Sequence, residues 1–250
     1  MRGKASERRE NPSAALVIFA KAPIPGQVKT RLCPGLTADE AATLHGSFVL
    51  DTLERTKTAV TKFKLPLDRF LACAPSSTHV FFRIMEDRHG VTLLDQQGED
   101  LGARMQQIFA TLFSQGYRRV CIVGTDAPSL PLTHYRDAIE SLTRHDVVLG
   151  PARDGGYYLI GMTKPLPDLF TDIPWSTDQV MALTQQKADA AGLKTAVLSA
   201  WSDVDTLDDL RALIDDSAAD RKRPKQEQVF STRTAGTLDL LAKRLRTRHT

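Results

Sequence analysis

The sequence is poor in cysteine and in aromatic residues. Of its 250 residues, three are cysteines and two are tryptophans, and aromatic side chains account for 6%. Cys33, Cys73 and Cys121 are odd in number and have no CxxC spacing, which indicates neither a disulfide framework nor a thiolate zinc site. Because Cys73 and Cys121 lie within apolar runs, we expect them to be buried thiols in a reducing cytoplasm.

Long apolar runs are also missing. No run approaches the roughly 18–20 residues that a membrane helix needs, and the charged N-terminus lacks the apolar core of a secretory signal. These features predict a cytoplasmic protein without a membrane partner. An apolar content of 42% and a charged content of 25% are typical of a soluble globular chain, which excludes a collagenous, coiled-coil or wholly disordered protein.

Neither sign of charge dominates the chain as a whole, but charge is unevenly distributed. The formal net charge is +3, whereas residues 1–10 carry +2 and residues 221–250 carry +7, so residues 11–220 carry −6. Basic ends can attract a nucleic-acid backbone without sequence preference. No recognition motif and no interleaved aromatic residues accompany these charges, so we expect no nucleic-acid partner.

Short apolar runs alternate along the chain with segments of helical periodicity. Strands are predicted at 14–20, 69–74, 91–95, 118–124, 146–151, 156–161 and 194–200. One helix is predicted after a capping box at Thr37 and Glu40. Another is predicted after a cap at Asp100, with an apolar stripe of Leu101, Met105, Ile108 and Leu112. Further helices are predicted at 78–88 and near 132–143, 178–190 and 206–214. Since parallel strands need crossover helices, this alternation predicts a three-layer α/β/α fold with a central, mostly parallel sheet.

The two ends of the chain depart from this pattern. Residues 1–12 are polar and are expected to form a disordered tail, residues 13–220 form the predicted domain, and residues 221–233 have the composition of a linker. Residues 234–250 form a predicted helix whose leucines, Leu238, Leu241 and Leu245, lie on one side. That stripe is too apolar for a free tail, so we expect the helix to dock on the domain or on a partner subunit of a homo-oligomer.

The loop after the first predicted strand carries cations between prolines and a glycine. Lys21, Gly26, Lys29 and Arg31 lie within 12 residues. Backbone N–H groups and cationic side chains are the groups that bind polyphosphate, with glycine permitting close approach. The alternative is a solvated basic loop. The loop is not a Walker A motif, because Val28 stands where that motif requires a glycine.

Carboxylates follow two other predicted strands. Asp126 comes after the strand at 118–124, and Asp203 and Asp205 come after the strand at 194–200. Carboxylates from separate strand ends can share one Mg²⁺, and because residues two apart point to opposite sides of an extended chain, one of the second pair is expected to face the ligand. Alternatively, Asp205 or Thr206 caps the following helix.

Two further segments allow both a functional and a structural interpretation. Asp154, Gly155 and Gly156 lie between two predicted strands, where they form either an ordinary hairpin turn or a backbone surface for substrate. Trp175 lies in a proline-marked loop, where it either joins the core or stacks on a ring or sugar. No histidine pairs with another ligand at a metal-binding spacing, and the histidines are expected to be surface or capping residues.

Five motifs occur together in an order seen in one bacterial family. They are KAPIPGQVKTRL near the N-terminus, GEDLGARM at 98–105, GTDAPSL at 124–130, GPARDGGYYLIG at 150–161 and DVDTLDDL at 203–210. Over about residues 14–245 the chain resembles the radical-SAM/selenodomain-associated transferase 1 family of the nucleotide-diphospho-sugar transferase superfamily, whose fold is GT-A-like. The first motif also resembles phospholactate guanylyltransferases, and the set more distantly resembles molybdenum-cofactor nucleotidyltransferases.

This resemblance implies a nucleotide bound over the carboxyl edge of the sheet. By position, it places Lys29 and Arg31 at the phosphates and Gly102 in the nucleotide site. It makes Asp126 the principal ligand of Mg²⁺ or Mn²⁺, with Asp205, or alternatively Asp203, as the second. The sequence departs from related patterns in two places. Prolines replace most of a glycine-rich LAGG-type first loop, and residues 124–126 read Gly-Thr-Asp instead of Asp-x-Asp.

The sequence thus predicts a metal-dependent transferase acting on a nucleotide or nucleotide-sugar and a small-molecule acceptor. Nucleotidyl transfer is favoured, because a leaving pyrophosphate needs the cations of the first loop. Lys29, Asp126 and Asp154 are the expected catalytic residues, and Gly155, Gly156 and Trp175 are expected to face the acceptor or sugar. Glycosyl transfer from a nucleotide-sugar is the close alternative, with Asp154 binding or deprotonating the acceptor. A non-catalytic nucleotide-binding protein is the third possibility.

Overall fold

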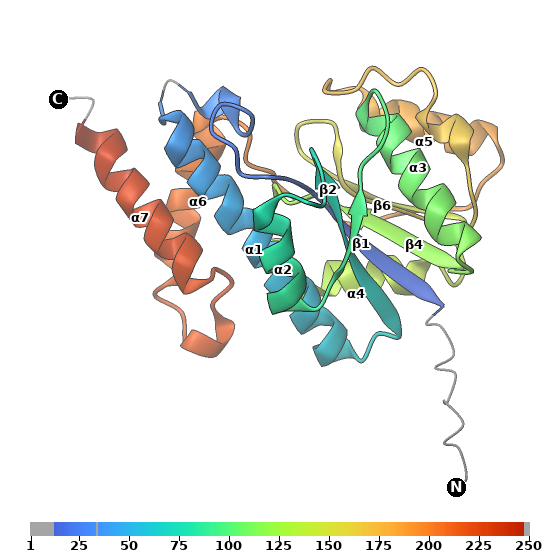
Figure 1. Ribbon diagram of the computed structural model, residues 1–250, viewed down its shortest axis with the longest axis horizontal. Coiled ribbons are helices and arrows are strands. Elements are labelled where there is room, and N and C mark those ends of the chain that lie inside the picture. The colour runs from blue at the N-terminus through green and yellow to red at the C-terminus, as the bar shows by residue number, and fades with distance from the viewer. Residues whose placement is uncertain (1–12, 34, 248–250) are drawn as a thin grey trace, which may run out of the picture.

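A computed structural model describes residues 13–33 and 35–247, and its centre is a seven-stranded sheet (Figure 1). The predicted tail at 1–12 lies outside these residues. The strands are β1 Ala14–Lys21, β2 Leu67–Ala74, β3 Thr92–Asp95, β4 Arg119–Val123, β5 Val147–Pro151, β6 Tyr157–Met162 and β7 Thr195–Val197. Their order is β3-β2-β1-β4-β6-β5-β7, and β6 runs antiparallel to both of its neighbours. The predicted mostly parallel sheet is therefore confirmed.

Helices cover both faces of the sheet, as the alternation of the sequence predicts. One face carries α1 Ala38–Phe63, α2 Val80–His89 and α4 Leu132–Ser141, and the other carries α3 Leu101–Ser114 and α5 Val180–Ala190 (Figure 1). Each face buries its own apolar cluster, because side chains alternate across a strand and β1 is covered on both sides. This confirms the three-layer α/β/α architecture.

Local signals in the sequence set most element boundaries, with a few corrections. The capping box at Thr37 and Glu40 and the cap at Asp100 are both present. Leu101 was expected in the apolar stripe of α3 but is 45% exposed as the first residue of the helix, whereas Met105, one turn later, is buried. The strand expected at 194–200 is regular over only three residues.

A third apolar cluster lies beside α1, away from the sheet. It joins α1 to α6 Leu207–Asp220 and α7 Thr232–Thr247, with Leu238 and Leu241 of α7 buried in it (Figure 1). Polar contacts support the docking, since Ser231 donates a hydrogen bond to Asp51 and Arg233 pairs with Glu54. The helix expected at 206–214 extends to residue 220. The segment expected as a linker contains a short 3-10 turn, Lys225–Glu227, before α7 begins.

The order of the strands identifies the place where a ligand is expected. From β1 the chain passes to β2 and β3 on one side, and β4 lies on the other side of β1. In open α/β sheets ligands bind at such a switch point, outside the carboxyl ends of the strands. Among the residues that the structure describes, no helix is long and apolar enough to cross a bilayer.

Candidate functional site

The loop that follows β1, residues 21–36, is called here the cation loop. It is held against α1, where the His45 Nε2 atom lies 3.0 Å from the Lys21 carbonyl oxygen. A Cβ atom placed on Gly46 would contact the Pro23 ring at 3.5 Å, an ordinary van der Waals distance, so the loop lies close to the helix. Farther along, Leu32 and Leu36 are buried in the cluster beside α1. The loop is therefore attached at both ends.

A pocket of about 280 Å³ opens between this loop and the ends of β1, β2 and β3. It is lined by Lys21, Ala22, Gln27, Val28, Ala74, Pro75, Gln96 and Arg104. The Gln96 amide is fixed, because its Nε2 atom donates to the carbonyls of Ala20 and Ala72 at 3.1 and 2.8 Å. Small apolar side chains, a fixed amide and two cations suit a planar ring that carries an anionic group.

Arg104 is a pocket residue that the sequence analysis did not single out. Its Nε atom donates to the Gly98 carbonyl at 3.0 Å, which anchors the guanidinium at the beginning of α3. The signal for it was present, since Arg104 belongs to the motif GEDLGARM. The sequence alone does not distinguish Arg104 from the solvated arginines of other helices.

Lys29 lies at the centre of the site and faces carboxylates. Its Nζ atom is 2.6 Å from Asp126 Oδ1, 2.9 Å from Asp205 Oδ1 and 2.6 Å from the Val204 carbonyl oxygen. Burial lowers the pKa of Lys29, but the attraction of both carboxylates outweighs this and raises the pKa overall. For Asp126, burial raises the pKa, but the Lys29 charge outweighs it and lowers the pKa. The predicted phosphate contact of Lys29 stays a prediction.

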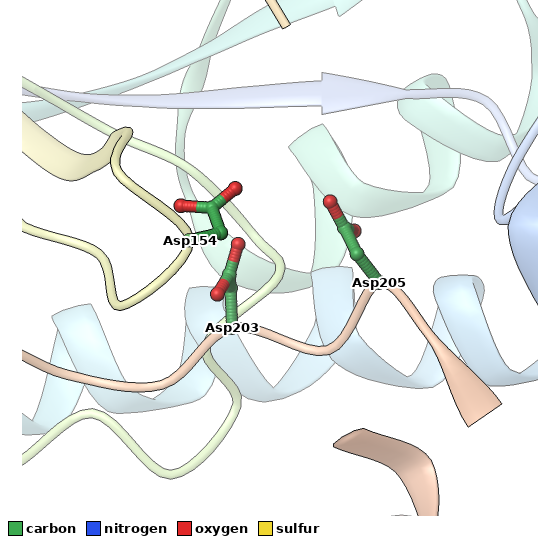
Figure 2. Close-up of side chains that lie close together, drawn as sticks. All are labelled: Asp154, Asp203 and Asp205. Atoms are coloured by element: carbon green, nitrogen blue, oxygen red, sulfur yellow. The ribbon is translucent and has the colours of Figure 1, made fainter. Parts of the chain in front are cut away.

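Three carboxylates form an acidic cluster close to Lys29, which contacts one of them, Asp205. One oxygen each of Asp154, Asp203 and Asp205 lies within 4.8 Å of the others, with Asp154 on the β5–β6 turn and the other two on the segment before α6 (Figure 2). Asp154 also accepts the Gly156 N–H at 2.9 Å. Burial, and next the charge of Asp154, raise the pKa of Asp203 to about 7. Thr206 caps α6, which leaves Asp205 for the cluster.

The acidic cluster fits a hard divalent cation. Its donors are all carboxylate oxygens, the ligands that Mg²⁺ and Mn²⁺ prefer. Burial, and next the neighbouring negative charge, raise the pKa of Asp203, and a cation would compensate that charge. Within the described part of the chain, this cluster contains both alternatives for the second metal ligand, Asp205 and Asp203, but not Asp126. The ligand role of Asp126 stays a prediction, and Asp154 is the member that the sequence did not suggest as a ligand.

For Trp175 and for the glycine turn, the structure supports a packing role in each case. Trp175 is half-buried and packs against Phe170, with ring centroids 6.3 Å apart. A Cβ atom on Gly155, whose φ is +91°, would lie 2.1 Å from the Asp178 carbonyl oxygen, so a glycine is required there. The turn at Asp154 is therefore packed against the loop that carries Trp175. Contacts of these residues with an acceptor stay predictions.

Two histidines contradict the expectation that all are surface or capping residues, and one of them, His134, packs its ring against Tyr158 and Trp201. His79 does cap α2, but His45 is buried in α1 beneath the cation loop. Burial lowers its pKa, so the imidazole is neutral at pH 7. The spacing of histidines carries no information about such a role, because the partner of His45 is a backbone carbonyl.

The fold, a mostly parallel seven-stranded sheet with helices on both faces, matches nucleotide-diphospho-sugar transferase-like structures. A family model described as an uncharacterized protein conserved in bacteria (DUF2064) matches residues 58–177. A crystal structure of a "putative nucleotide-diphospho-sugar transferase" from Desulfovibrio desulfuricans G20 is 32% identical, with a TM-score of 0.79 over 94% of this chain and 97% of that one. The chain belongs to the family of that protein.

More distant structures share the fold. A CMP:2-keto-3-deoxy-manno-octonic acid synthetase complexed with CTP is 13% identical, with a TM-score of 0.51 over 82% of this chain and 99% of the other. A 4-diphosphocytidyl-2C-methyl-D-erythritol synthase from Anaerococcus prevotii DSM 20548 is 11% identical, with a TM-score of 0.51 over 80% of this chain and 95% of the other. No match was found among curated proteins.

Proposed function

We propose that this protein is a metal-dependent nucleotidyltransferase that acts on a nucleoside triphosphate and a phosphorylated or hydroxylated small molecule. One observation carries the proposal. A ring-sized pocket with two cations and a cluster of three carboxylates lie at the same carboxyl edge of the sheet, with Lys29 between the loops that form them. Cations for phosphates and carboxylates for a metal are the two requirements of phosphoryl chemistry.

In this proposal the pocket receives the nucleoside and the cation loop faces the phosphates. Lys21 and Arg104 line the pocket, and the exposed guanidinium of Arg31 lies at the other end of the loop. Gly26, at a φ of +79°, allows the backbone to turn toward a phosphate. These groups bind and orient the triphosphate, and they stabilise the negative charge that moves onto the leaving pyrophosphate.

Asp154, Asp203 and Asp205 would hold Mg²⁺ or Mn²⁺. When bound, such a cation neutralises phosphate oxygens and makes the phosphorus more susceptible to attack. The acceptor is proposed to lie over Gly155, Gly156 and Trp175, next to the acidic cluster. From there its phosphate or hydroxyl oxygen would attack the α-phosphorus, and the bond from that phosphorus to pyrophosphate would break.

Names of related proteins support nucleotide chemistry but divide on the transferred group. Of the distant structures, one is named as a CMP:2-keto-3-deoxy-manno-octonic acid synthetase complexed with CTP, and another as a 4-diphosphocytidyl-2C-methyl-D-erythritol synthase. The 32% identical relative is named as a nucleotide-diphospho-sugar transferase, which favours glycosyl transfer as the second candidate. We also propose that the chain belongs to the narrower radical-SAM/selenodomain-associated transferase 1 family, which its sequence motifs resemble.

Product analysis tests the proposal. The protein is incubated with nucleoside triphosphates or nucleotide-sugars, Mg²⁺ or Mn²⁺, and a panel of phosphorylated and hydroxylated acceptors. Release of pyrophosphate from a triphosphate supports nucleotidyl transfer, whereas release of nucleoside diphosphate from a sugar nucleotide supports glycosyl transfer. Ligand binding without either product would indicate a non-catalytic nucleotide-binding protein. Asp154→Asn should lose turnover, and Asp168→Asn, in the exposed first turn of the 3-10 helix Pro167–Phe170, is the matched control.

A further inference from the structure

We propose that Lys29 is a positioning residue, an internal cation that joins the cation loop to Asp126 and Asp205 and thereby sets the positions of the carboxylates at the active site. In the sequence analysis Lys29 was expected to contact phosphate. The phosphate contacts are assigned instead to Lys21, Arg31 and Arg104, and this part of the inference rests on the proposed function.

The Lys29 ammonium is surrounded by oxygen atoms. Its Nζ atom donates hydrogen bonds to the Val204 carbonyl and to Asp205 Oδ1, and it forms an ion pair with Asp126 Oδ1 at 2.6 Å. The side chain is 5% exposed. A phosphate oxygen could bind Nζ only after one of these contacts had broken.

The three contacts join separate parts of the chain. The Val204 N–H donates to the Asp126 carbonyl at 3.0 Å, so the loop after β4 and the segment before α6 are already joined through their backbones. Lys29 connects the cation loop to both. On the same loop, a Cβ atom on Gly35 would lie 2.5 Å from a methyl group of Leu207, the first residue of α6. The loop is therefore packed against the segment that carries Asp205.

The backbone at Lys29 is held in a conformation that costs energy. Its φ is +50° and its ψ is +37°, in the left-handed region that residues with a Cβ atom adopt at a cost of about 1 kcal/mol or more. This conformation precedes the 3-10 turn Thr30–Leu32, whose Leu32 is buried. In this strained conformation, the Lys29 side chain points inward and its ammonium lies between the carboxylates of Asp126 and Asp205.

Arg31 does not take over this role. Its guanidinium is 63% exposed and lies 3.9 Å from Asp205. Without the Lys29 charge, Asp126 and Asp205 would face each other and the rest of the acidic cluster uncompensated. Their mutual repulsion would move Asp205 away from Asp154 and Asp203.

A double-mutant cycle on the protein without nucleotide and with EDTA tests the internal cation directly. Lys29→Met should lower the melting temperature at pH 8 by about 2–6 °C, because two partly exposed carboxylates lose the buried ammonium that compensates their charge. In an Asp126→Asn background the same substitution should have less than half that effect. Lys21→Met, on the same loop but exposed, is the matched control and should shift the melting temperature by under about 2 °C. Small and additive effects of Lys29→Met would overturn the proposal.

Kinetics separate positioning from phosphate contact if the protein proves to use nucleoside triphosphates. Lys29→Met should lower kcat about 100-fold, because misplaced catalytic groups slow the reaction, and leave KM for the triphosphate within about 3-fold. Arg104→Met should instead raise that KM by about 10–100-fold. An unchanged kcat with a raised KM in Lys29→Met would overturn the assignment. If the wild-type protein turns over no nucleotide, the proposed function fails, and the thermal cycle still decides the role of Lys29.

Discussion

A Cβ atom placed on Gly102 would lie 2.5 Å from Cζ2 of Trp175, so the indole rests directly on the first turn of α3. The glycine was expected from its motif to belong to the nucleotide site. The structure supplies a packing reason for it, because a larger residue would push Trp175 off the helix. This contact holds the Trp175 loop on α3, and the contact of Gly155 with Asp178 holds the same loop beside the Asp154 turn.

Gly102→Ala should therefore lower the free energy of unfolding. Overpacking of a filled site costs about 1–3 kcal/mol, and the better helix propensity of alanine returns up to about 1 kcal/mol. The fluorescence of Trp175, recorded in a Trp201→Phe background, should also change. Gly46→Ala is the matched control in α1, where the added methyl would meet Pro23 at an ordinary 3.5 Å. It should stabilise the protein by about 0.5–1 kcal/mol, and the prediction fails if the two alanines behave alike.

The contribution of Asp203 to the stability of the folded protein depends on pH. Its pKa is about 7 in the folded protein against an ordinary value of 3.8, so the folded state favours the protonated carboxyl. Stability associated with this group is fully present below about pH 4 and is lost as pH rises through 7. In EDTA, Asp203→Asn should raise the melting temperature by about 3–6 °C at pH 8 and by less at pH 5. Calorimetric scans at both values check this, and a difference that does not depend on pH would contradict it.

The acidic cluster should bind Mn²⁺ without nucleotide. Asp154→Asn and Asp203→Asn should each weaken Mn²⁺ affinity at least about 10-fold, because each removes an anionic oxygen ligand. Binding at pH 7 should also release protons, since Asp203 is partly protonated there. Titration calorimetry in two buffers of different ionisation enthalpy measures both quantities. Asp168→Asn should leave affinity and proton release unchanged, and equal effects in all three variants would remove the cluster as the metal site.

The C-terminal helix should contribute to the stability of the domain itself. Leu238 is 1% exposed in the cluster beside α1, whereas Leu240, two residues along the same helix, is 69% exposed. Leu238→Ala should cost about 2–5 kcal/mol of unfolding free energy, and Leu240→Ala less than about 0.5 kcal/mol. Urea unfolding at two protein concentrations checks the difference. A larger effect of Leu240→Ala would instead indicate that α7 docks on a partner subunit.

Much of the fold could be predicted because its signals are local. The run AALVIFA predicts a strand covered on both faces, and β1 is such a strand. The capping boxes at Thr37 and Thr206 begin α1 and α6. Asp126 and Asp205 were expected near one another because both follow strands, and the carboxyl ends of parallel strands meet at one edge.

The site depends on contacts that periodicity does not encode. Lys29 lies 176 residues from Asp205 along the chain, and nothing in the spacing of either residue indicates an ion pair instead of a phosphate contact. His45 has the same residue type as the half-buried histidines, and its burial follows from the contact of α1 with the end of β1. Arg104 and Gln96 become pocket residues only when three strand ends and the cation loop come together.

The sequence by itself determined the class of fold and the chemical groups available at one edge of the sheet, because alternation, caps and strand ends are properties of neighbouring residues. Only the tertiary structure decided which cation faces phosphate and which holds carboxylates in place. The physical reason is that an ammonium group satisfies whichever acceptors surround it. Lys29 is surrounded by Asp126, Val204 and Asp205, which the folded chain brings together from two distant segments.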